Sequence, residues 1–254
     1  MDEILVELAE EPGLWLPDEP SRSVFTGEGY SVVTSGRLAW VQRIRLDAGA
    51  VEPAVEDVRA LLRERSFGEV SWWVGERSAP DDLADQLLRL GLEPDDPAQM
   101  TTLAIASAPG GEPRVEVREV AELTDFLRAL EIDWESFGVP AAERAERRVA
   151  AERSWPLICA DGRQSTFLAF LDGEPVGFGR TIHTPWAGLL MGGATLPGAR
   201  GRGVYGSLVH ARWNEAVRRG IPQLAVSAGP MSAPILARLG FERLGRVQLL
   251  RDTL

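Results

Sequence analysis

The chain has 254 residues, of which 44% are hydrophobic, with 38 acidic and 27 basic side chains and a formal net charge of −11. That length suffices for one large domain or for two small ones with separate cores. The sequence pI near 4.8 argues against nonspecific nucleic-acid binding, which depends on a basic surface.

The N-terminal stretch is acidic and lacks the basic and apolar regions of a signal peptide, and no later apolar run reaches the length of a membrane span. We therefore expect a soluble, cytoplasmic protein. One cysteine, Cys159, and two histidines are too few for a structural zinc cluster, so we expect no metal.

Charge is distributed unevenly along the chain. Residues 1–110 contain 9 Arg and 21 Asp or Glu, a net charge of −12, whereas residues 111–254 contain 18 Arg and 17 Asp or Glu, a net charge of +1. An anionic cofactor would therefore be better tolerated by the second half.

In chain order, the first half predicts a hairpin, a helix, a strand and a second helix. The hairpin spans Tyr30 to Leu46, the helix 55–65 and the strand 70–74, and the second helix ends near Leu88. Small and turn-forming residues from Ser107 to Pro113 then predict an interdomain linker. We place domains at 1–110 and 111–254.

The second half predicts strands that dominate its centre and alternate with helices afterwards. The predicted strands are 115–118, 167–171, 175–182, 188–196, 223–227 and a last one after Phe241, and the predicted helices are 121–134, 140–153, 204–219 and 232–238. The fold class is therefore α/β (α+β), with a mixed, mostly antiparallel central sheet flanked by helices.

The order of hairpin, helix, strand and helix occurs in both halves. The helix end Leu88-Arg89-Leu90-Gly91-Leu92-Glu93 also matches Ala237-Arg238-Leu239-Gly240-Phe241-Glu242, 149 residues later. Glycine after an apolar helix end is an ordinary C-cap, so the shared order carries more weight than the match. Together they predict two copies of one fold.

The segment from Ala194 to Gly206 is rich in glycine and precedes a predicted helix. Glycines let successive backbone N–H groups approach an anion, and the helix dipole adds positive potential. Arg200 and Arg202 could reach phosphate oxygens. The segment thus predicts a pyrophosphate site, although a plain glycine turn is the simpler alternative.

A dinucleotide-binding fingerprint is a second alternative, because Gly201, Gly203 and Gly206 have its spacing. That fingerprint expects an acidic residue about twenty positions later, where the chain has Ser227-Ala228-Gly229. Only 48 residues follow Gly206, too few for the rest of a doubly wound sheet. Both observations disfavour this alternative.

The glycine segment resembles the phosphate loop of the GNAT superfamily of acyl-CoA-dependent N-acyltransferases, Q/R-x-x-G-x-G/A. Pro197, Arg200 and Gly203 match the pattern, and Tyr205 stands at the final Gly/Ala position. The order of helix, strand, helix and Leu-Gly-Phe that follows also agrees. The resemblance covers 115–254 well and 20–106 only as a faint, degenerate copy.

The resemblance implies that acetyl-CoA, or another acyl-CoA, lies between two splayed parallel strands, with Gly192-Gly193 at the usual bulge. The amine would attack directly, without a covalent acyl-enzyme, so Cys159 would be a packing residue. The implied cofactor-binding residues are Ala194, Thr195, Leu196, Arg200, Gly201, Arg202, Gly203, Val204, Tyr205, Gly206, Ser207 and Ser232.

The family often places an Asn before the last helix and a proton-donating Tyr within it, and these positions fall on Gly229 and Leu236. His183 and Glu135 are the candidate bases. A structural histidine and a solvated helix carboxylate are the ordinary alternatives. Trp134, Trp155 and Trp186 would lie near the acceptor pocket, if they are not simply core residues.

We expect an N-acetyltransferase that acts on a small-molecule or peptide amine. The alternatives are a catalytically weak acyl-CoA-binding or sensor module, and a purely structural pairing module. Asp47 and Glu52 would repel a pyrophosphate in the first half, which predicts a structural or acceptor-shaping role there. The oligomeric state, including a homodimer, stays open.

Overall fold

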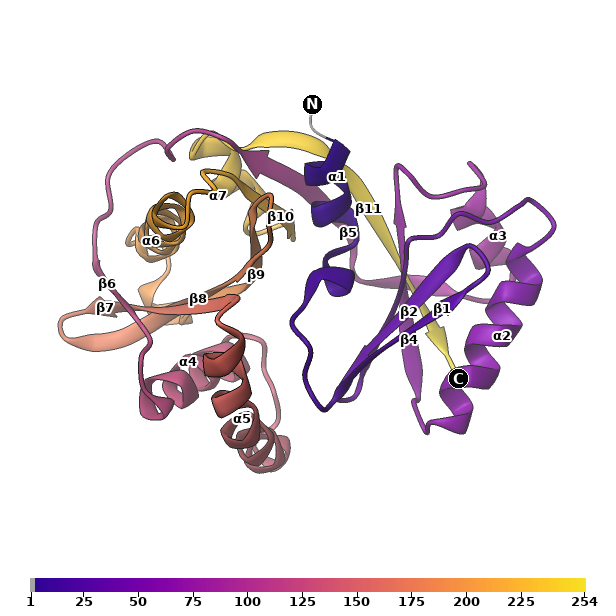
Figure 1. Ribbon diagram of the computed structural model, residues 1–254, viewed down its shortest axis with the longest axis horizontal. Coiled ribbons are helices and arrows are strands. Elements are labelled where there is room, and N and C mark those ends of the chain that lie inside the picture. The colour runs from indigo at the N-terminus through magenta and orange to yellow at the C-terminus, as the bar shows by residue number, and fades with distance from the viewer. Residues whose placement is uncertain (1–2) are drawn as a thin grey trace. The chain divides into compact units, whose positions relative to one another are not determined.

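The computed structural model describes residues 3–254, so Met1 and Asp2 lie outside the described residues. The chain divides into two compact units (Figure 1). The first contains residues up to Leu103 together with Ser227–Ala233 and Arg243–Leu254, and the second contains Ala104–Val226 and Pro234–Glu242. The C-terminal strand therefore belongs to the unit that is formed mainly by the first half of the chain.

The first unit is a sheet in the order β1-β2-β3-β4-β11, with β5 next to β11. The β1–β2, β2–β3 and β4–β11 pairs are antiparallel, and β3 and β4 are parallel. Its elements are α1 (Glu3–Glu10), the 3-10 turn η1 (Pro12–Trp15), β1 (Arg22–Gly27), β2 (Tyr30–Ser35), β3 (Leu38–Gln42), α2 (Val51–Glu64), β4 (Glu69–Gly75), α3 (Leu83–Arg89), β5 (Glu93–Ile105) and β11 (Glu242–Thr253).

Helix α2 begins at Val51, four residues before the predicted start at 55. Val51, Val55, Val58 and Leu62 are all buried, so they form an apolar stripe at helical spacing that covers the sheet. The opposite side is charged. The predicted helix was therefore the right element with too late a start, while α1 and β1 were not predicted.

The second unit is a sheet in the order β10-β9-β8-β7-β6, antiparallel except for the β9–β10 pair. Its elements are β6 (Glu116–Glu119), α4 (Leu123–Ser136), α5 (Ala141–Asp161), β7 (Gln164–Leu171), β8 (Glu174–His183), β9 (Gly188–Thr195), the 3-10 turn η2 (Pro197–Ala199), α6 (Val204–Arg218), β10 (Leu224–Ala228) and α7 (Ala233–Arg238).

Helix α5 is longer than predicted, because it continues past residue 153 to Asp161 with Pro156 inside it. The helix ends where Gly162 takes the left-handed conformation, φ 67°, that closes many helices. The predicted end was therefore wrong by eight residues. The loop glycine, and not the proline, stops this helix.

Helices α4 and α6 lie on opposite faces of β7, β8 and β9 (Figure 1). Ala129 and Ile132 of α4 pack on Leu168, whereas Val204 and Leu208 of α6 pack on the adjacent Phe167 and Ala169. Neighbouring residues of a strand point to opposite faces, which accounts for the division. Strand β9 is therefore covered by α4 on one side and by α6 on the other.

The predicted fold class is confirmed: both units are mixed, mostly antiparallel sheets with flanking helices. Each contains a hairpin, a helix and a strand parallel to the second hairpin strand. Within residues 3–254, no helix is long and apolar enough to cross a bilayer. The same residues hold no group of three or more His, Cys, Asp or Glu side chains that could bind a metal ion.

Candidate functional site

Strands β9 and β10 separate soon after they pair. Strand β9 is eight residues long, but its registered partners on β10 are only Gly188 with Leu224 and Leu189 with Ala225. On the other side of β9, Gly179 and Thr181 of β8 face Gly193 and Leu190, so β9 has one extra residue in this interval. A bulge of this kind bends a strand away from its neighbour.

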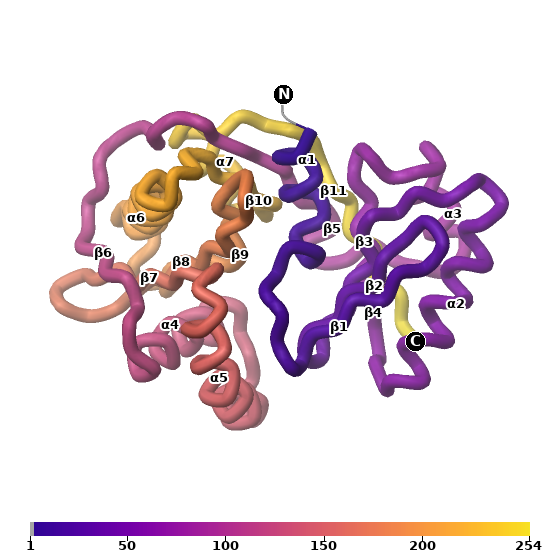
Figure 2. Tube along the Cα trace, viewed as in Figure 1, coloured from indigo at the N-terminus to yellow at the C-terminus, as the bar shows by residue number. Residues whose placement is uncertain are grey.

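Gly192 lies within the bulge and has φ +91°, a conformation that residues with a Cβ rarely adopt. The sequence therefore specifies the bulge through a glycine, as the pair Gly192-Gly193 predicted. The bulge leaves β9 unpaired with β10 over the part of the strand that leads to the glycine-rich segment. Figure 2 traces the chain from β9 through this segment into α6.

The segment after β9 forms the turn η2 and then Gly201 and Gly203, with φ +76° and +84°, before α6 begins at Val204. No side chain caps the helix at Gly203. The first N–H groups of a helix have no partner within the helix, so those of Val204, Tyr205 and Gly206 remain as donors. Apart from its chain neighbours and the nearby backbone of α6, no described atom lies within 4 Å of the position that a Cβ on Gly206 would take. The geometry therefore fits an anion.

Ser207 ties a distant segment to the start of α6. Its hydroxyl accepts hydrogen bonds from the backbone N–H groups of Arg114 and Val115, at 2.8 and 3.2 Å, and donates to the carbonyl of Gly203 at 3.1 Å. The side chain of Arg114 consequently covers Gly203, where an added Cβ would lie 2.6 Å from its Cδ. Sequence spacing gave no sign of Arg114, because the contact is tertiary.

Arg200 and Arg202 are exposed beside this turn. Arg200 Nε donates to the carbonyl of Thr195 at 3.3 Å, and Arg202 lies 3.6 Å from a carboxylate oxygen of Asp172. Both interactions are at the surface and weak, so both side chains can turn toward a phosphate. Ala194 is buried against α4, so its contribution to a ligand would come from the backbone.

Ser232 is the one predicted cofactor-binding residue that belongs to the first unit. Its hydroxyl donates to the carbonyl of Gly229 at 3.3 Å. The remaining predicted residues, from Ala194 to Ser207, form one continuous segment of the second unit. The structure thus brings together the loop and the start of α6, with Arg114 as an addition.

A small pocket of about 40 Å³ opens beside Gly192 on the face covered by α4. Asp133 and Arg180 are its charged residues, and the others are Phe126, Ala129, Leu130, Thr166, Phe178 and Gly192. Burial raises the pKa of Asp133 above its usual value, against the opposing effect of Arg180 and Arg147. Arg180 Nε donates to the carbonyl of Met191 at 2.7 Å. A carboxylate and the bulged backbone therefore line the same pocket.

Glu135, the candidate base predicted from the sequence, lies two residues after Asp133 on α4. Residues two positions apart on an α-helix are separated by about 200° around the helix axis, so these carboxylates point to opposite sides of α4. Asp133 faces the sheet and Glu135 is exposed. Neighbouring Ile132, fully buried in the α4 core, was the available signal that this side of the helix faces inward.

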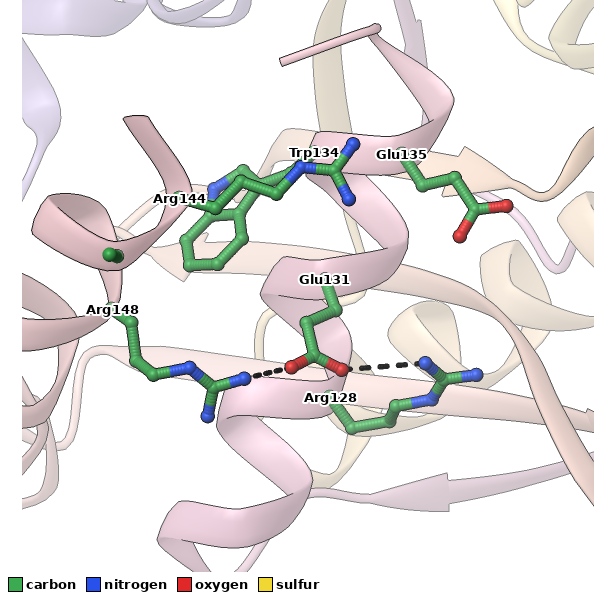
Figure 3. Close-up of a pocket in the computed structure, with 7 residues that line it drawn as sticks. Arg128, Glu131, Trp134, Glu135, Arg144 and Arg148 are labelled. Carbon is green, nitrogen blue, oxygen red and sulfur yellow. Dashed lines mark hydrogen bonds and ion pairs between the residues drawn. The ribbon is translucent and has the colours of Figure 1, made fainter. Parts of the chain in front are cut away.

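Glu135 lines a second pocket, of about 220 Å³, between α4 and α5 (Figure 3). Glu131 lies at its centre, held by Arg148 and, at 3.4 Å, by Arg128. Trp134 and Arg144 complete the wall that Figure 3 shows. Glu135 is not among the residues that surround Gly192.

His183 is buried at the end of β8, opposite Gly188 and away from the bulge. Its Nε2 lies 3.0 Å from the hydroxyl of Ser165. Burial, together with Arg219, lowers its pKa to about 4, so the ring is neutral at neutral pH. Its surroundings are those of a structural histidine, and it lies at the C-terminal end of α6.

The three tryptophans differ in exposure. Trp134 is buried, Trp155 stacks at 4.9 Å between ring centroids on Phe126 of the small pocket, and Trp186 is 42% exposed. Leu236, at the position where the resemblance expects a tyrosine, is fully buried. Tyr205 instead approaches β9, with its ring 3.4 Å from the position of a Cβ on Gly193.

Comparison with known proteins gave matches only among solved structures. No protein-family model matches the chain, and no curated protein matches it in sequence. A GCN5-related N-acetyltransferase from Kribbella flavida superposes with a TM-score of 0.70 at 18% identity, covering 91% of this chain and 90% of its own. A GCN5-related N-acetyltransferase from Sphaerobacter thermophilus gives 0.61 at 20% identity, with 98% and 90% covered.

A tandem GNAT protein from the clavulanic acid biosynthesis pathway gives a TM-score of 0.62 at 14% identity and covers 93% of this chain and 84% of its own. The 254-residue chain therefore has the tandem GNAT fold. The likeness extends over both halves, in agreement with the predicted duplication.

Proposed function

We propose that this protein is an N-acyltransferase that moves an acetyl group from acetyl-CoA to an amine. The observation that carries the proposal is the combination, within one unit, of the Gly192 bulge, the β9–β10 opening and the uncapped start of α6. The GNAT fold of the solved structures supports it. The acceptor is inferred to be a small-molecule or peptide amine.

The residues of the second unit fit the cofactor. The N–H groups of Val204, Tyr205 and Gly206 would hold the pyrophosphate, with Arg200 and Arg202 as mobile cationic contacts. Backbone groups of β9 would hold the pantetheine arm. Acetyl-CoA, when bound, supplies an activated thioester whose C–S bond is exchanged for a C–N bond.

Asp133 is the base that we propose in addition to the two predicted from the sequence. It is the carboxylate in the pocket beside Gly192, and burial raises its pKa toward the range useful for accepting a proton. An ammonium acceptor loses two protons in the reaction. Asp133 accepts one and releases it to solvent, and the other ends on the CoA sulfur. Orientation of the amine by the narrow pocket contributes the rest.

A catalytically weak acyl-CoA-binding module is the second candidate function. Leu236, fully buried and unable to donate a proton, favours it. The two functions share the cofactor site and differ only in turnover. They therefore make the same prediction for CoA binding and opposite predictions for acyl transfer.

Incubation of the protein with acetyl-CoA and a panel of primary amines tests the proposal, with release of free thiol as the signal. We expect thiol release that depends on at least one amine and exceeds the rate without protein. CoA binding without any amine-dependent release would favour the binding module. Absence of CoA binding would reject both functions.

A further inference from the structure

Arg212 of α6 is a fully buried arginine, only 1% exposed. Its Nε donates to the carbonyl of Leu208 at 3.1 Å and its Nη1 to the carbonyl of Gly192 at a long 3.5 Å. Nη2 is buried without a hydrogen-bond partner among the described residues. Burial lowers the pKa of Arg212, and Tyr205 opposes that effect. A buried cation without a carboxylate is costly, so its position calls for a reason.

The two strands beneath Arg212 are built to admit it. Gly179 of β8 and Gly193 of β9 are direct partners in the sheet. A Cβ on Gly179 would lie 3.0 Å from both Cζ and Nε of Arg212, and one on Gly193 would lie 3.5 Å from Nη1. The ring of Tyr205 covers the guanidinium, with 5.6 Å from Cζ to the ring centroid. The guanidinium of Arg212 thus packs between two paired glycines and an aromatic ring, next to the bulge.

Through its contact with the carbonyl of Gly192, Arg212 faces the peptide group that joins Gly192 to Gly193. In a trans peptide the C=O and the following N–H point in opposite directions, so the N–H of Gly193 points away from Arg212. Arg212 lies on the α6 face, whereas the pocket with Asp133 and Gly192 lies on the α4 face. A cation bound to the carbonyl also polarises the peptide and makes its N–H a stronger donor.

We propose that Arg212 is a positioning residue for acyl transfer, which holds the Gly192–Gly193 peptide so that the Gly193 N–H donates to the acyl oxygen. The inference rests on the proposed function. It assigns to a buried side chain the task of preorganising a backbone donor where negative charge develops. Arg212 itself does not touch the ligand.

The competing interpretation is that Arg212 and Tyr205 only fill the space left by Gly179 and Gly193. The two interpretations differ in one observable. A packing residue affects the stability of the fold and the binding of every ligand alike. A positioning residue affects specifically the recognition of the acyl carbonyl.

The test compares the affinities of the full chain for CoA and for a thioether analogue of acetyl-CoA that keeps a ketone carbonyl. One hydrogen bond to that carbonyl predicts that the parent binds the ketone about three- to tenfold more tightly than CoA. Arg212→Met should abolish this preference while leaving the affinity for CoA within about twofold. Arg212→Lys, which keeps the charge, should retain part of it. Arg218→Met, on the exposed side of the same helix, is the matched control.

Equal affinity of the parent for CoA and the ketone would overturn the inference, and so would a preference that survives in Arg212→Met. If Arg212→Met does not fold, Gly179→Ala replaces it, because the added methyl group displaces the guanidinium without removing it. An unchanged preference in a folded Gly179→Ala would equally count against the inference. A parent that binds neither ligand would reject the proposed function itself.

Discussion

The two halves of the chain take the same route from a hairpin through a helix into a parallel strand, and then differ. Strands β3 and β4 pair over two positions, as β9 and β10 do. The segments that follow β3 and β4, however, remain hydrogen-bonded to each other. Ala79 N–H donates to Ile44 O at 3.0 Å and Leu46 N–H donates to Ala79 O at 3.1 Å. In the first half, backbone hydrogen bonds thus continue to join the two parallel strands beyond their paired positions. In the second half, the Gly192 bulge leaves the corresponding strands apart.

The helices that follow these strands, α2 and α6, also differ at their first turns. Helix α2 begins with buried Val51 and has Glu52 in its first turn, while Ile44 and Leu46 complete an apolar core. Helix α6 begins after Gly203 and has no acidic residue in its first turn. A shared topology therefore does not give the two halves the same local geometry. Glycines at the bulge and at the helix start distinguish the two copies.

The largest expected effect concerns the stability of the first unit. Arg59 of α2 binds Asp252 of β11 through two hydrogen bonds of 2.9 Å, and Asp252 is buried. Asp252→Ala removes both hydrogen bonds and leaves Arg59 with Glu56 and the carbonyl of Leu90 as partners, so it should lower the free energy of unfolding by about 3 kcal/mol. Urea denaturation measures this. CoA affinity of the folded variant should not change, and a specific loss of affinity would give the first unit a binding role that we do not assign to it.

The next effect concerns turnover in the second unit. Asp133→Asn should lower kcat about 100- to 1,000-fold, because the base is lost while the shape of the side chain is kept. The parent rate should rise with pH through the pKa of Asp133, which burial places above the usual value, since only the carboxylate accepts a proton. Stopped-flow or steady-state thiol release across pH measures both.

Glu135→Gln and His183→Gln are the matched controls for Asp133, and they also test the two bases predicted from the sequence. If Glu135 or His183 is the base, its variant loses turnover and Asp133→Asn does not. With His183 as base, the rate would reach its plateau just above pH 4, because its pKa is about 4. Equal activity of all three variants would leave water as the proton acceptor.

His183 should also make the second unit sensitive to acid. Its pKa falls from 6.5 in the unfolded chain to about 4 in the folded one, so the unfolded chain binds the proton first as pH falls. Stability from this group is complete above pH 6.5 and is lost as pH falls toward 4, by up to about 3 kcal/mol. His183→Gln should lose less stability than the parent between pH 7 and 4.5 in urea denaturation. Parallel losses in both proteins would contradict the assignment.

The smallest effect concerns charge. The net charge of −12 on residues 1–110 should attract cationic amines, an effect that salt weakens. We expect kcat/KM for a cationic amine to fall about two- to tenfold between low and high salt, and that for a neutral amine of matched size to stay constant. An equal response of both amines would mean that the acidity serves another purpose, such as solubility.

The features that sequence predicted are those set by local chemistry. The turn Asp172-Gly173 joins β7 to β8 as expected, and the glycine segment leads into α6 at Val204. Arg114, Asp133 and Arg212 could not be predicted, because their placement depends on contacts between elements far apart in the chain. The placement of β11 beside β4 was equally hidden, since nothing local in its sequence names its partner strand.

Calorimetric titration of CoA into the parent, Gly206→Ala and Gly206→Glu tests the central claim most directly. Gly206 has open space at its Cβ, so both variants should fold, unlike a substitution at Gly203, whose φ is +84° and whose Cβ would meet Arg114. We predict one CoA per chain, nearly unchanged affinity in Gly206→Ala, and a loss of about tenfold or more in Gly206→Glu, whose carboxylate repels the pyrophosphate. Two CoA molecules per chain, or equal affinity in Gly206→Glu, would contradict a single cofactor site at the start of α6.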